Sequence, residues 1–147
     1  MNHLDLTILV IDETAIRASI IEEGLREAGH LRVTVIHEVQ GVARIIETLK
    51  PDVIIIDIEN PNRDMMEHLF QLTRSVSRPI AMFVDRSDSA SIEAAVDAGV
   101  SAYVVDGLRK ERIQNILDLC ISRFNAFARL NDELDRTRSA LQERKVI

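Results

Sequence analysis

Five short apolar runs divide the chain up to residue 108, and a stretch with helical spacing follows each of them. They lie at residues 7–11, 31–36, 53–56, 80–84 and 102–105. The first is nearly all apolar and rich in β-branched residues, which suits a strand buried on both faces, whereas the second alternates and predicts a strand nearer the edge. Strands that alternate with helices are joined by right-handed crossovers. The sequence therefore predicts one parallel sheet with helices on both faces.

The segments between the runs predict helices over residues 14–28, 39–49 and 64–73, and a fourth that begins near Ser89. The spacing also predicts which positions face the core. In the first helix these are Ile16, Ile20, Ile21, Leu25 and Ala28, ahead of Gly29. In the fourth helix they are Ile92, Ala95 and Val96, ahead of Gly99.

The last segment differs because neither Pro nor Gly interrupts it from Arg109 to the C-terminus. A helix of this length would extend about 55 Å, more than a small domain can cover. Its first part carries a stripe that can dock on the sheet: Ile113, Ile116, Leu117, Cys120, Ile121 and Phe124. Heptad spacing continues at Phe127, Leu130, Leu134, Thr137 and Leu141. We expect a domain over residues 1–124 and a coiled coil or helical hairpin over residues 125–147, with a frayed polar tail as the alternative.

The composition excludes several classes of function. A net charge of −6 and an aromatic content of 3% argue against nucleic-acid binding by this chain alone. Cys120 is the only cysteine, so no intrachain disulfide forms. The apolar runs are too short to span a membrane and the N-terminus lacks a secretory signal, so we expect a cytoplasmic protein without membrane contact.

Acidic residues end four of the five predicted strands: Asp12 and Glu13, Asp57, Asp85 and Asp106. Ligands of a parallel sheet bind beyond these carboxyl ends. With the strand order 2-1-3-4-5, Asp12, Glu13 and Asp57 are expected to converge, and no cation such as Lys is expected beside them. Three clustered carboxylates need a cation or a proton, and Mg²⁺ suits oxygen ligands. The alternative is that these acids only cap the following helices.

Three segments resemble the landmarks of a response-regulator receiver domain: residues 8–13, residues 53–57 and residues 99–105. The resemblance covers residues 6 to about 124. It implies a flavodoxin-like (CheY-like) five-stranded parallel sheet of order 2-1-3-4-5 with an extended C-terminal helix, and Asp57 as the phosphoacceptor. It also implies Mg²⁺ ligands at Asp12, Glu13 and Asp57, with the backbone carbonyl of Glu59 completing the protein's share.

Two positions depart from the receiver pattern. The family has Thr or Ser at the end of the fourth strand, where this chain has Val84, and Lys at the end of the fifth, where it has Asp106. Both normally contact the phosphoryl group, so we expect slow phosphorylation or a weak response to it. Tyr103 matches an aromatic residue that swings between two rotamers in receivers, and plain packing is an equal alternative.

Residues 79–85 and 104–108 are similar to the receivers of ANTAR-type transcription antiterminators, and within that group to nitrate/nitrite-assimilation regulators. In that family a long helix leads from the receiver, as a coiled coil, into a small RNA-binding domain. Residues 130–147 are similar to that junction. The resemblance implies that the chain is truncated where the RNA-binding domain would begin.

Together these features predict a non-enzymatic, signal-receiving domain that controls transcription antitermination. A histidine kinase or a sensor protein would act on it, and RNA would be bound only through the missing domain. It would form a homodimer through Phe127, Leu130, Leu134 and Leu141. Three alternatives remain: a phosphorylation-independent pseudo-receiver switched by a partner sensor, a structural coiled-coil adaptor, and a small Mg²⁺-dependent phosphatase, for which no Ser/His pair or phosphate-binding glycine loop is visible.

Overall fold

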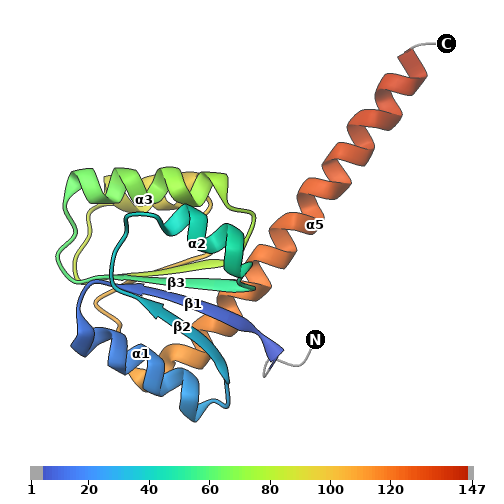
Figure 1. Ribbon diagram of the computed structural model, residues 1–147. Helices are drawn as coiled ribbons and strands as arrows, with labels where there is room; N and C mark the ends of the chain where they lie inside the picture. Colours follow the sequence, from blue (N-terminus) through green and yellow to red (C-terminus); the bar gives the residue numbers. More distant parts are fainter. Residues whose placement is uncertain (1–4, 146–147) are drawn as a thin grey trace.

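A parallel sheet of five strands forms the centre of the molecule (Figure 1). The structure, a computed structural model, describes residues 5–145. The strands are β1 (Thr7–Asp12), β2 (Arg32–Ile36), β3 (Val53–Ile58), β4 (Ile80–Val84) and β5 (Ala102–Val105). Their spatial order is β2-β1-β3-β4-β5, and every neighbouring pair is parallel. The predicted flavodoxin-like topology is therefore confirmed.

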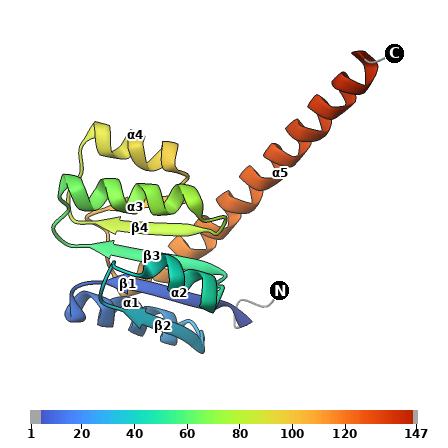
Figure 2. The same cartoon turned by 45° about the horizontal axis from the view of Figure 1, so that its top comes forward.

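Helices cover both faces of the sheet. They are α1 (Ala15–Glu27), α2 (Val42–Leu49), α3 (Arg63–Ser75), α4 (Ser89–Ala98) and α5 (Ile113–Lys145), with a 3₁₀ turn, η2 (Lys110–Arg112), before the last. One face carries α1 and the base of α5, and the other carries α2, α3 and α4 (Figures 1 and 2). Because side chains alternate along a strand, Leu9 and Ile11 enter one core while Ile8 and Val10 enter the other.

Two predicted helix faces are wrong in part. Ile16 is 77% exposed, because the buried side of α1 runs through Ala18, Ile21 and Leu25. In α4, the face packed on the core is made of Ala95 and Ala98. Small side chains bring this short helix close to the sheet, and its larger residues, Ile92 and Val96, stay on the outer side.

The long last helix is confirmed. Its base is buried through Ile113, Ile116, Leu117 and Cys120, with Ile121 packed beside them. Beyond this base α5 leaves the domain and projects away from it (Figure 2). Phe127, Leu130, Leu134 and Leu141 are 47% to 70% exposed there. Residues 146–147, the end of the predicted coiled-coil segment, lie outside the described residues. Within residues 5–145 no helix has both the length and the apolar character needed to cross a membrane.

Candidate functional site

The carboxyl ends of β1 and β3 bring the predicted acidic residues together. Asp12 and Asp57 face each other across the two strands, and both are buried. A cleft of about 110 Å³ opens beside them. It is lined by Asp12, Glu13, Thr14, Asp57, Ile58, Glu59, Asn60 and Met65. The four residues expected to hold Mg²⁺ therefore share one cleft, and the Glu59 carboxylate accepts a hydrogen bond from the Thr14 hydroxyl at 3.1 Å.

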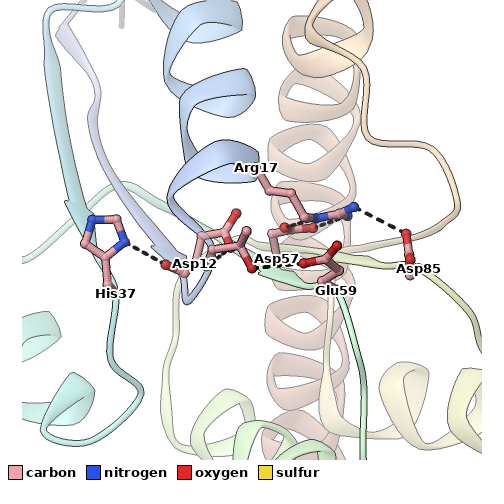
Figure 3. Close-up of polar contacts among 7 residues, drawn as sticks. Asp12, Arg17, His37, Asp57, Glu59 and Asp85 are labelled. Atoms are coloured by element: carbon pink, nitrogen blue, oxygen red, sulfur yellow. Dashed lines mark hydrogen bonds and ion pairs between the residues drawn. The ribbon is translucent and has the colours of Figure 1, made fainter.

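The cation of this site is Arg17, which the sequence did not lead us to expect (Figure 3). Its Nε lies 2.6 Å from Oδ2 of Asp57, and its Nη2 lies 2.8 Å from Oδ1. Its third nitrogen, Nη1, lies 3.3 Å from a carboxylate oxygen of Asp85, at the end of β4. The expectation that no cation lies near the carboxylates is wrong. Arg17 is on the inward face of α1, four residues before the buried Ile21, and this spacing was the one signal that pointed to it.

Asp12 meets different surroundings from Asp57. Its Oδ1 accepts a hydrogen bond from the backbone N–H of Thr14, whereas its Oδ2 has no hydrogen-bond partner among the described residues. Burial, followed by the proximity of Asp57, raises the pKa of Asp12 to about 8. The exposed ring of His37 donates from Nδ1 to the backbone oxygen of Asp12 at 2.9 Å (Figure 3). Burial and the neighbouring Asp57 thus favour the neutral form of Asp12, whereas Asp57 forms the ion pair with Arg17.

The two atypical positions stand at the ends of β4 and β5. Val84 is buried, and its side chain offers no hydrogen-bonding group. Asp106 is exposed in a left-handed conformation with φ of 51°, and its backbone N–H donates to the carbonyl of Val84. Tyr103 packs against the core, and its hydroxyl lies 2.8 Å from the hydroxyl of Ser87. Tyr103 is thus partly buried against the core in this structure.

Comparison with known proteins identifies the family. The family model of the response regulator receiver domain matches residues 8–118. The chain belongs to the response-regulator receiver family. It is therefore a receiver domain of the kind that acts in two-component signalling. Such receivers interact with histidine kinases and are generally not enzymes, although other similar proteins are protein-glutamate methylesterases.

Individual proteins are also similar to this chain. The transcriptional regulatory protein PdtaR of Mycobacterium tuberculosis is 27% identical over 140 residues, which are 95% of this chain and 68% of PdtaR. The KDP operon transcriptional regulatory protein KdpE of Escherichia coli is 29% identical over 119 residues, 81% of this chain and 52% of KdpE. A response regulator from Thermotoga maritima has the same fold, with a TM-score of 0.67, 20% identity and coverage of 80% of this chain and 98% of its own.

Receiver domains typically bind Mg²⁺ at their phosphorylation site. The donors here are carboxylates, which Mg²⁺ prefers, and the buried Oδ2 of Asp12 lacks a hydrogen-bond partner among the described residues. The arrangement nevertheless does not fit the ion, because Arg17 holds both oxygens of Asp57. Within residues 5–145, no three His, Cys, Asp or Glu side chains are grouped closely enough to hold a metal ion.

Proposed function

We propose that this chain is the signal-receiving domain of an ANTAR-type transcription antiterminator, in which α5 passes the state of the receiver to an RNA-binding domain. The observation that carries the proposal is α5 itself. Its base is packed into the receiver core, and its outer part presents Phe127, Leu130, Leu134 and Leu141 to solvent at heptad spacing. In this proposal residues 1–124 are the receiver and residues 125–147 are the connecting coiled coil.

The similarity to other regulators supports this proposal. PdtaR and KdpE are both transcriptional regulatory proteins. The receiver family match ends at residue 118, whereas the match to PdtaR covers 95% of the chain and therefore extends into the outer part of α5. The narrower likeness of residues 79–85 and 104–108 favours a regulator of nitrate or nitrite assimilation. A histidine kinase or a sensor protein would be the partner that sets its state, in the cytoplasm.

The coiled-coil part of the proposal predicts a homodimer. Exposed Leu and Phe side chains each gain roughly 1.5–3 kcal/mol when they are buried, and a parallel partner helix would supply that burial. Leu130→Asp together with Leu134→Asp should convert the dimer into a folded monomer in sedimentation experiments. Ala128→Asp with Ser139→Asp adds the same charge off the heptad stripe and should leave the dimer intact. A wild-type chain that stays monomeric at high micromolar concentration would contradict the dimer.

The antitermination part needs a test in the organism that carries the gene. A reporter placed behind a regulated terminator should lose read-through when the gene is deleted and regain it when the complete gene product is restored. The Leu130→Asp/Leu134→Asp version of the complete product should restore less read-through than the Ala128→Asp/Ser139→Asp version. Unchanged read-through in the deletion strain would rule out this function.

A second candidate, a receiver switched by a partner sensor without phosphorylation, is favoured by the acceptor site. Val84 and Asp106 stand where phosphoryl contacts are usual, and a phosphoryl group near −2 is repelled by Asp106. We therefore expect acetyl phosphate to label wild-type protein slowly. Val84→Thr combined with Asp106→Lys should give a phosphate-linked change in oligomeric state. Rapid labelling of the wild-type protein, with a change in oligomeric state, would argue for the phosphorylated receiver instead.

A further inference from the structure

We propose that Arg17 is a built-in counter-ion of Asp57, which occupies the place of a metal ion at the acceptor and must leave before Asp57 can react. The inference deepens the proposed function, since it rests on the chain being a receiver, and it concerns how its acceptor is controlled. It assigns a role to a residue of α1 that the receiver resemblance does not include.

The contacts of Arg17 engage all three nitrogens of its guanidinium. All three nitrogens face carboxylate oxygens, two of them on Asp57 and one on Asp85. The parallel pair of bonds to Asp57 is the bidentate geometry that makes Arg–carboxylate pairs strong and directional. The side chain of Arg17 is 16% exposed and that of Asp57 is 0% exposed. Each oxygen of Asp57 therefore already accepts a bond from Arg17, and the side chain is closed off from solvent.

The position of Arg17 on its helix shows that the pair does more than neutralise a surface charge. Arg17 lies in the first turn of α1, which begins at Ala15. The N-terminal end of a helix carries a partial positive charge, which disfavours a cation there. The carboxylates of Asp57, in β3, and of Asp85, directly after β4, therefore provide the attraction that keeps the guanidinium inward.

A guanidinium and a divalent cation compete for Asp57. Both would have to approach the same two oxygens, and like charges a few ångströms apart in a poorly solvated site repel each other strongly. The same contacts restrain phosphorylation. In that reaction an oxygen of Asp57 forms a bond to the phosphorus of an acyl phosphate, the bond from phosphorus to the acyl oxygen breaks, and the acyl group leaves as a carboxylate. While Arg17 holds both oxygens, neither is directed at an incoming phosphorus atom.

The first test is a calorimetric titration of Mg²⁺ alone into the wild-type chain and into Arg17→Met. The variant should bind Mg²⁺ at least tenfold more tightly, since the competing charge is gone. Arg26→Met is the matched control, because Arg26 is on the same helix with its side chain 71% exposed and contacts only Glu22 among the ion pairs of the described residues. It should bind as the wild type does. If circular dichroism shows Arg17→Met to be unfolded, Arg17→Gln, which keeps a hydrogen-bond donor, replaces it.

The second test adds acetyl phosphate with Mg²⁺ and measures the phosphoprotein formed. Arg17→Met should be labelled at least tenfold faster than wild type, and an added Asp57→Asn change should abolish the label. Equal Mg²⁺ affinity and equal labelling in wild type and variant would overturn the inference. Slower labelling of the variant would also overturn it, because Arg17 would then assist phosphoryl transfer to Asp57. These readouts are confined to the receiver. Failure of the proposed function would appear in the sedimentation and read-through experiments instead.

Discussion

Cys120 lies on the inner face of α5, in the same buried cluster as Phe83 and Ile113. Burial raises the pKa of its thiol to about 12, so the reactive thiolate is almost absent near neutral pH. We expect a thiol reagent at pH 8 to label the native chain about a hundredfold more slowly than the chain in urea. Since the chain has one cysteine, the label reports this site alone. Rapid labelling of the native protein would show that the base of α5 opens readily.

The same thiol contributes to the pH dependence of stability. Its ordinary pKa is 9.0 and its value in the fold is about 12, so the unfolded chain releases this proton first as the pH rises. Stability from this group is therefore complete below pH 9 and is lost between pH 9 and 12. The urea midpoint of Cys120→Ala should fall less over this range than that of the wild type. Parallel curves for the two proteins would contradict the burial of Cys120.

At the acceptor site, the sequence predicts the acids but not their cation. Asp12 and Asp57 end two strands that the topology makes neighbours, so their convergence follows from the strand order alone. Arg17 could not be assigned in the same way, because an Arg in an amphipathic helix usually lies on the solvent side. The choice between Ile16 and Arg17 for the inward position depends on where the helix starts and on how it is rotated about its axis. Only the structure provides that rotation.

Among the secondary-structure elements, α1 and the base of α5 pack closely against each other at Gly24. A Cβ atom at this position would lie 2.8 Å from the backbone oxygen of Lys110 and 2.9 Å from Cγ1 of Ile113. Gly24→Ala gains about 1 kcal/mol of helix propensity, but this overlap with backbone costs about 1–3 kcal/mol. We expect a net loss in the free energy of unfolding, measured in urea. Ser19→Ala, at an exposed position of α1, should change it by less than about 0.5 kcal/mol.

The strands were easier to predict than the faces of the helices. Buried strands in a parallel sheet are apolar almost throughout, so β3 and β4 stand out from their flanks in the sequence. A helix buries one stripe only, and α4 does so through Ala95 and Ala98. Alanine is common on both faces of helices, so its burial leaves little trace in a hydrophobic pattern. The prediction placed Ile92 and Val96 on the inner stripe together with Ala95, and of these three only Ala95 is buried.

At the scale of the whole molecule, the receiver and the outer part of α5 are energetically separable. From residue 125 to 143 nearly every side chain is exposed, and the base of α5 holds the contacts to the core. A chain ending at Phe124 should fold and remain monomeric. Its free energy of unfolding should lie within about 1 kcal/mol of that of the full-length chain in its monomeric form. Urea unfolding and sedimentation measure both properties. Loss of cooperative unfolding would show that the outer helix stabilises the receiver.

Because α5 is one unbroken helix, a change of angle at its base displaces its far end by a larger distance. The base of the helix rests on α1, β4 and β5, and Lys145 lies beyond it on the same straight element. With about 1.5 Å of rise per residue, the arm from residue 124 to residue 145 is about 30 Å long. A tilt of about 5° at the base would carry the tip by about 3 Å, because the displacement grows in proportion to the length of the arm. A rearrangement of α1, β4 or β5 that tilted the base of α5 would therefore appear at its far end as a movement as large as a side chain.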